Sequence, residues 1–348
     1  MIGNNIELTA EDLKAISLLN DFLPEKIFDM HMHIGCRDIC PNMWANDSVF
    51  AQCGEENTMD SYLAHNGPFF GNRMIRANMI VCPDKSMCDP LNGHRDAGTK
   101  LLVRELEKHP QCVGEIMISA KDTFQELEGM LVHPRIRGFK CYHVTSGNPN
   151  SFQCHIGEFL PESAWQVADK HGLCITLHMV RDLALADPEN MAYICKMADK
   201  YPHAKLILAH AGRSFAAWTV METVEQLAPY KNVYFDLSAV CEPGPFFEII
   251  RKCGHKRVFW GSDYPVSMFR GKCISIGPSF LWLYKEQLEQ CASKTNFSAY
   301  LVGIENLLAV RTACKMLDLT KEQIGDIFYN NAMDLFDLQD YKTDCRGC

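Results

Sequence analysis

The sequence predicts an α/β fold in which eight parallel strands, with helices between them, close into a (β/α)8 barrel. Short runs of β-branched and other apolar residues recur along most of the chain, separated by longer amphipathic stretches. The runs are continuously apolar, as expected for strands of a parallel sheet that is buried on both faces. Polar residues directly follow several runs, and barrel enzymes carry their functional side chains at the carboxyl ends of the strands.

Eight apolar runs are the predicted strands. Eight such units in series favour a closed barrel over an open, doubly wound sheet. The open sheet typically places a glycine-rich phosphate-binding turn after its first strand, whereas His31-Met32-His33 stands here. The runs are 27–34, 77–82, 112–119, 138–143, 173–179, 205–211, 232–237 and 257–262.

Helical signals fill the stretches between the runs. Residues 98–109, 161–170 and 190–200 place apolar side chains at helical spacing. Each stretch has basic residues near its C-terminal end, where the helix dipole favours them. Residues 321–336 are expected to add helical turns that close the barrel.

A helical extension precedes the first strand. Thr9 and Asp12 have the spacing of a capping box, with Asp in place of the usual Glu, and the predicted helix continues to about Phe22. We therefore expect a single domain over residues 1–348, with the barrel core at about 27–338.

Two connections are longer than a barrel needs, and both leave the carboxyl end of a strand. They are residues 35–73, after the first predicted strand, and residues 264–298, after the eighth. Long loops at this end usually act as lids, substrate walls or oligomer contacts. The sequence is therefore compatible with a homo-oligomer.

Composition narrows the class of partner. The chain has a net charge of −9 and no long basic run, which makes it a poor candidate for nucleic-acid binding. No apolar stretch approaches the roughly 18–20 residues that span a bilayer, and no export signal is recognisable at Met1–Thr9. Many of the 17 cysteines lie inside apolar runs, as small buried side chains do. We expect a cytoplasmic protein with reduced thiols and a small-molecule substrate.

His31 and His33 end the first predicted strand. Side chains alternate along a strand, so these two point the same way, into the barrel mouth. Two imidazoles on one face can bind one cation at about 2.0–2.1 Å each. Taken alone, the pair could equally be packed or surface histidines.

Polar residues at the other strand ends favour the metal site. Together with His31 and His33, they would bring seven polar groups from five strands to one end of the barrel, and burying such a cluster is costly unless it binds something. Glu115, inside the third run, is either an inward partner of Lys140 or a charge at the barrel top. The strand-end residues are Lys140, His143, His178, His210 and Asp263.

These pieces together resemble the amidohydrolase superfamily, in particular the amidohydrolase-related branch of metal-dependent hydrolases and decarboxylases. The resemblance runs from about residue 27 to 338 and implies a metal-dependent barrel enzyme. It implies that His31, His33, His178 and Asp263 are metal ligands and that His210 is a catalytic or second-metal histidine. The matching pieces are His31-x-His33, 138–140, His178, 209–212, 261–265 and 331–336.

The chemistry of these groups agrees with those roles. Imidazoles and one carboxylate suit Zn²⁺, with Mn²⁺, Fe²⁺ or Co²⁺ as alternatives. A bound divalent ion brings the pKa of its water towards neutrality. Asp263 can accept the water proton, and His210 can polarise a substrate carbonyl or hold an oxyanion.

Lys140 bears on the number of metal ions. Some members of the superfamily bridge two ions with a carboxylated lysine at the matching place. An uncarboxylated lysine is a cation and cannot ligate, so we favour one ion, with two as the alternative. Lys140 would then meet a substrate carboxylate.

Other basic residues lie near the predicted site. Arg181 and Arg213 each follow a site histidine by three residues, and both could clamp an anionic substrate. Surface salt bridges at the barrel rim are the alternative for each. His143 is a further predicted substrate-binding residue.

The leading functional hypothesis is hydrolysis of a C–N or C–O bond in an amide, lactone or ester that carries a carboxylate. The alternative is metal-dependent, non-oxidative decarboxylation of an aromatic or enoic acid. A purely structural metal site is disfavoured, because structural zinc takes four closed protein ligands and no open position.

Overall fold

The computed structural model describes residues 8–45, 48–89, 91–277, 279–292 and 298–339. Its main sheet has nine strands in the order β2-β1-β3-β4-β5-β6-β7-β8-β9. All neighbours are parallel except β2 (Glu56–Asn57), a short antiparallel addition to the end of β1. The eight predicted runs are confirmed as β1 (Lys26–Cys36), β3 (Met74–Val81), β4 (Val113–Met117), β5 (Ile136–Tyr142), β6 (Cys174–His178), β7 (Lys205–Leu208), β8 (Val233–Asp236) and β9 (Val258–Phe259).

The first and last barrel strands meet through backbone hydrogen bonds. Met30 N donates to Trp260 O at 3.0 Å, and His33 N donates to Tyr264 O at 2.9 Å. In the other direction, Asp263 N donates to His31 O at 2.7 Å. The sheet therefore curls until its two edges pair, as the predicted barrel requires.

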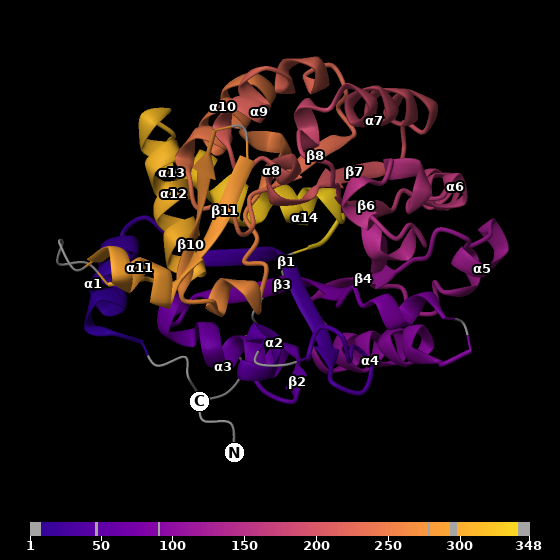
Figure 1. The fold of residues 1–348 in the computed structure, drawn as a ribbon, viewed down its shortest axis with the longest axis horizontal. Helices are drawn as coiled ribbons and strands as arrows, with labels where there is room; N and C mark the ends of the chain where they lie inside the picture. The colour runs from indigo at the N-terminus through magenta and orange to yellow at the C-terminus, as the bar shows by residue number, and fades with distance from the viewer. Residues whose placement is uncertain (1–7, 46–47, 90, 278, 293–297, 340–348) are drawn as a thin grey trace.

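Helices surround the strands on the outside (Figure 1). The predicted capping box of α1 is present, since the Thr9 side chain accepts from Asp12 N and the Asp12 carboxylate accepts from Thr9 N. The helices are α1 (Ala10–Leu19), α2 (Val49–Gln52), α3 (Met59–Phe70), α4 (His94–Lys108), α5 (Phe124–Gly129), α6 (Glu162–His171), α7 (Pro188–Lys200), α8 (Ala209–Arg213), α9 (Ala217–Met221), α10 (Pro243–Cys253), α11 (Lys285–Ala292), α12 (Val302–Met316), α13 (Lys321–Gly325) and α14 (Asn331–Leu335).

The last helical turns close the amino-terminal end of the barrel. Met333 and Phe336 belong to a buried apolar cluster that includes Phe28, Val113 and Phe259 from barrel strands. The Phe28 and Phe336 rings stack with their centroids 5.8 Å apart. Because side chains fill the amino-terminal end of the barrel, an open site can form only at the carboxyl ends of the strands.

Both long connections contain regular structure. Residues 35–73 form α2, β2 and α3. The connection after β9 forms an antiparallel hairpin of β10 (Gly271–Ile276) and β11 (Ser279–Tyr284), orange in Figure 1, which continues into α11. Among the described residues, no helix is both long and apolar enough to cross a bilayer.

Candidate metal centre and active site

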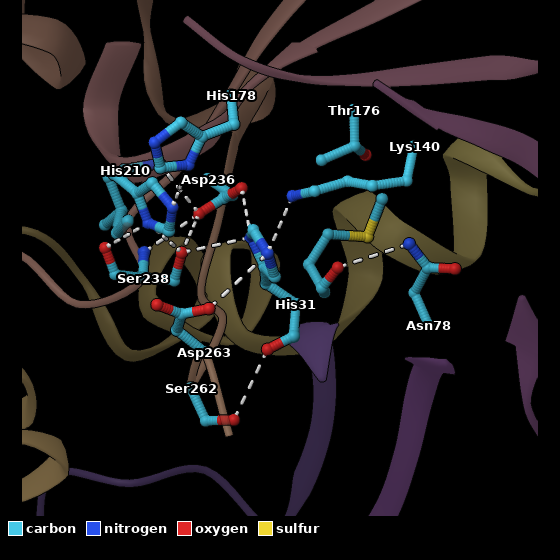
Figure 2. Close-up of polar contacts among 12 residues, drawn as sticks. His31, Asn78, Lys140, Thr176, His178, His210, Asp236, Ser238, Ser262 and Asp263 are labelled. Atoms are coloured by element: carbon cyan, nitrogen blue, oxygen red, sulfur yellow. Dashed lines mark hydrogen bonds and ion pairs between the residues drawn. The ribbon is translucent and has the colours of Figure 1, made fainter. Parts of the chain in front are cut away.

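The predicted residues converge at the carboxyl end of the barrel strands. His31 and His33 come from β1 and Lys140 from β5, while Asp263 follows β9, and all four are buried. His178 ends β6, and His210 lies in the turn directly after β7. Figure 2 shows His31 between Asp236, Lys140 and Asp263, with the His178 and His210 rings on one side.

Three donor atoms form a nearly equilateral triangle. His31 Nε2 lies 3.2 Å from His33 Nε2, and Asp263 Oδ1 lies 3.6 Å from the first and 3.3 Å from the second. Donors bound to one tetrahedral ion at about 2.0–2.1 Å are about 3.3–3.4 Å apart. The two imidazoles and the carboxylate therefore fit a single divalent cation in spacing and in donor chemistry.

Asp236 orients His31 within this triangle. Its Oδ2 lies 3.0 Å from His31 Nδ1, so the ionised carboxylate accepts a hydrogen bond from that nitrogen. His31 Nε2 is then left as a lone pair that faces His33 and Asp263. A carboxylate behind a ligating histidine is a common second partner in metal sites, because it fixes the tautomer and raises ligand basicity.

The protonation states suit a cation. Burial lowers the pKa of His31 and of His33, which keeps both imidazoles neutral. Burial alone would raise the pKa of Asp263, but the electrostatic effect of His210 and the contact with His33 bring it to about 2. Neutral imidazoles and an ionised carboxylate are the forms that ligate metal ions.

Asp236→Asn should weaken metal binding about 10- to 100-fold, because the amide keeps the shape of the carboxylate but loses its charge. Competition with a chromophoric chelator measures the dissociation constant. Asp326→Asn is the matched control, since Asp326 pairs with His255 and Lys256 and does not contact the site. Equal affinities in the two variants would contradict the role of Asp236.

His178 lies at the predicted strand end, and its role as a metal ligand stays a prediction. We expected it to share one metal position with His31, His33 and Asp263, but its Nδ1 lies 3.1 Å from His210 Nε2. The close donor groups among the described residues are His31, His33 and Asp263, and His31, His210 and Asp236. His178 therefore lies at the predicted end of the barrel but is hydrogen-bonded to His210 outside the donor triangle.

His210 is held in an unusual backbone conformation. His210, Ala211 and Gly212 have φ values of 55°, 54° and 71°, so three successive residues are left-handed. The His210 ring lies 2.9 Å from Ser238 Oγ through its Nδ1. Left-handed non-glycine residues are costly and are often found at functional sites. This turn aims the ring at His178 and at the cavity above the donor triangle.

Lys140 lies directly beside the candidate ligands. Its Nζ is 3.0 Å from His31 Nε2, and its side chain is buried.

Glu115 lies inside the barrel, where its Oε1 accepts from Asn78 at 2.8 Å and from Thr176 at 2.8 Å. Glu115 is therefore inward, as one alternative predicted, but it is hydrogen-bonded to Asn78 and Thr176 and not to Lys140.

A cavity of about 390 Å³ opens over His178, His210 and Asp263. Arg213 also lines it, with its guanidinium 5.0 Å above the Phe280 ring and its Nη1 donating to Arg181 O at 3.1 Å. Within the described part of the chain, no carboxylate lies within ion-pair distance of Arg213, and Asp182 acts on it only as a nearby charge. An unpaired guanidinium in a cavity wall is suited to bind a substrate carboxylate.

The other two predicted substrate-binding residues do not line this cavity. Arg181 forms ion pairs with Asp187, at 3.2 Å, and with Glu189, so the salt-bridge alternative applies to it. His143 turns its Nδ1 to Ser151 Oγ at 2.8 Å and packs against the Phe152 ring, which itself lines the cavity. Arg181 is occupied by these ion pairs, whereas His143 Nε2 is buried without a hydrogen-bond partner among the described residues, and substrate binding by either residue stays a prediction.

The sequence analysis missed Asp236 and Ser238. Asp236 is the next-to-last residue of the seventh predicted run, 232–237, and it ends the observed strand β8, as His178 ends β6. The rule that identified His178 would also have found Asp236. Ser238, which donates to Asp236 and contacts His210, had no such signal.

The arrangement has a counterpart among known families. A family model described as "Amidohydrolase" matches residues 110–338, which is more than half of the chain. The chain belongs to the amidohydrolase family. The matched span of this amidohydrolase includes Lys140, His178, His210 and Asp263, whereas His31 and His33 precede it.

Individual relatives differ in the reaction that they are named for. The amidohydrolase is 31% identical over 129 residues to L-fucono-1,5-lactonase of Burkholderia ambifaria, covering 32% of this chain and 42% of the lactonase. The chain thus spans less than half the length of that curated relative.

Two solved structures share the fold at low identity. A zinc-bound amidohydrolase from Burkholderia multivorans has a TM-score of 0.58 and 11% identity, covering 90% of this chain and 100% of its own. A dihydroxybenzoic acid decarboxylase from Polaromonas sp. JS666, with manganese and the inhibitor 2-nitroresorcinol, has a TM-score of 0.56 and 12% identity. It covers 90% of this chain and 97% of its own. At this identity the likeness shows the barrel fold.

Proposed function

We propose that this amidohydrolase is a metal-dependent hydrolase that cleaves the C–O or C–N bond of a small lactone, ester or amide bearing a carboxylate. The observation that carries the proposal is the donor triangle of His31, His33 and Asp263, with edges of 3.2–3.6 Å, whose Asp263 lines an open cavity. The similarity to a lactonase supports hydrolysis.

His31, His33 and Asp263 would hold one divalent ion, with His178 the predicted fourth ligand, and Zn²⁺ is favoured over Mn²⁺ by the nitrogen-rich donor set. Bound there, the ion supplies Lewis acidity, which makes water acidic enough to act as a nucleophile near neutral pH. A cavity wall beside the donors leaves room for a substrate, which a closed structural site does not.

Three side chains of the site have proposed roles in proton transfer, charge stabilisation and substrate binding. Asp263 lines the cavity as an ionised carboxylate and can accept the proton of the attacking water. His210, also in the wall, can hold the substrate oxygen on which negative charge develops. Arg213 can hold the substrate carboxylate and so fix which bond faces the donor triangle.

A product assay tests the proposal. The purified, metal-loaded protein is offered lactones, N-acyl compounds and aromatic or enoic acids, and released acid and CO2 are measured separately. We expect acid release with at least one lactone, ester or amide. CO2 release from a carboxylic acid, without acid release from any of the others, would replace hydrolysis by the decarboxylation alternative.

Lys140→Ala should raise KM for an anionic substrate about 10- to 100-fold, the effect of losing one charge-assisted hydrogen bond, and leave metal content unchanged. Added short carboxylic acids should not restore activity. Loss of one of two bound ions in the variant, with partial rescue by a short acid, would instead show that Lys140 is carboxylated and bridges two ions.

A further inference from the structure

The hairpin after β9 presents one aromatic face to the cavity. Phe280 and Trp282 stand two residues apart on β11, so their side chains lie on the same side of the strand, and both line the cavity. Leu281, between them, points the other way and is 45% exposed. The hairpin thus contributes a wall that the barrel strands themselves do not supply.

A column of rings joins this wall to the candidate centre. The Phe215 ring lies 4.4 Å from the Phe280 ring and 5.8 Å from the Trp282 ring, measured between centroids. On its other side, Phe215 stacks on His210 at 6.0 Å, with an interplanar angle of 26°. The aromatic faces therefore continue from the hairpin down to a histidine of the site.

The aromatic wall also holds the Arg213 guanidinium in place. Arg213 lies over the Phe280 ring at 5.0 Å, a distance at which the ring face attracts a guanidinium. One of its nitrogens is bound to Arg181 O, and the rest of the planar fork remains available to a carboxylate. A ligand carboxylate on Arg213 would bring the ligand's body against Phe280 and Trp282.

Besides Arg213, the polar groups of the cavity wall are His178, His210 and Asp263, the hydroxyls of Tyr142 and Tyr284 and the indole nitrogen of Trp282. His178 and His210 are hydrogen-bonded to each other, and Asp263 faces His31 and His33. Most other wall residues are apolar or aromatic, among them Val49, Phe152, Val266 and Phe269. A ring with several hydroxyl groups would bury some of them against these apolar side chains without partners, which costs affinity.

We propose that Phe280 and Trp282 determine specificity and select a flat, unsaturated or aromatic ring that carries a carboxylate, against polyhydroxylated rings such as sugar lactones. The inference rests on the proposed function only in placing the reacting bond at the donor triangle. The ring stacks on the hairpin face, its carboxylate is held by Arg213, and its reacting group reaches Asp263 and His210.

Binding of three matched carboxylates to the metal-loaded enzyme tests this, by calorimetric titration. Benzoate is flat, cyclohexanecarboxylate is apolar but not flat, and quinate is a polyhydroxylated ring with the same head group. Benzoate should bind at least tenfold more tightly than quinate and measurably more tightly than cyclohexanecarboxylate. Trp282→Leu should weaken benzoate binding about tenfold, since aromatic stacking is lost while an apolar side chain remains.

Leu281→Ala is the control, because it alters the same strand on the outward face. It should leave benzoate affinity unchanged, and metal content should be equal in all three proteins. Quinate binding as tight as benzoate, equal effects of the two substitutions, or no binding of any probe would overturn the proposal. Because binding is measured without turnover, selective benzoate binding with CO2 release would reject hydrolysis and leave this inference standing.

Discussion

Asp263→Asn should lower kcat by about 10²- to 10⁴-fold, the range over which a positioned general base accelerates proton transfer. The amide keeps the size of the side chain, so the fold and the hydrogen bond from Asp263 N to His31 O should persist. It cannot accept a proton from water, and it is a poorer ligand than a carboxylate. Steady-state kinetics with the substrate found in the product assay measures the loss.

Two checks separate the roles of Asp263. Metal analysis of the variant, with and without excess metal, shows how much of the loss comes from an empty site. Asp326→Asn is again the control, because Asp326 pairs with His255 and Lys256 and does not contact the site. Near-normal turnover in Asp263→Asn would remove this residue from proton transfer.

Removing the metal with a chelator should abolish activity, and about one equivalent of Zn²⁺ per chain should restore it. The donor triangle offers one position with matched spacing, and a lysine that stays a cation cannot bridge a second ion. A titration of activity against added metal should break at one equivalent. A break at two would show the binuclear alternative.

Thermal unfolding gives an independent measure of the same site. A ligand that binds only the folded state stabilises it by about 4 kcal/mol when its concentration is 1,000 times Kd. The metal-loaded protein should therefore unfold at a higher temperature than the chelated protein. Circular dichroism of the chelated protein should still show the barrel, because its core is apolar and separate from the donors. An unchanged unfolding temperature would argue against metal binding by the folded chain.

The sequence was most informative about the barrel and about which residues end its strands. Strands buried on both faces need continuous apolar runs, and a polar residue such as His178 or Asp263 after such a run is conspicuous. The same pattern placed His31 and His33 on one face, as the structure shows. Asp236 obeyed the rule as well and was overlooked.

The features that could not be predicted from the sequence depend on which side chains become neighbours in the fold. Arg181 and Arg213 occupy equivalent positions after a histidine, yet one finds Asp187 and Glu189 nearby and the other does not. The contact between His178 and His210 depends on a left-handed turn that Ala211 does not signal. The hairpin of β10 and β11 was expected only as a long connection, because its outer face is partly apolar and its strands do not alternate cleanly.

The way in which the barrel closes has a consequence for how the chain folds. Asp263 and Tyr264 hydrogen-bond to β1 through their backbones, and the same few residues bring the Asp263 carboxylate to His31 and His33. Contacts so distant in sequence form late, because loop-closure entropy opposes them until the intervening strands are in place. A nascent chain that has not yet been synthesised as far as residue 263 has two of the three donors and cannot complete the triangle. Binding of the proposed metal therefore requires that the first and last strands have paired. The time at which a refolding chain begins to bind metal would then measure the final step of folding.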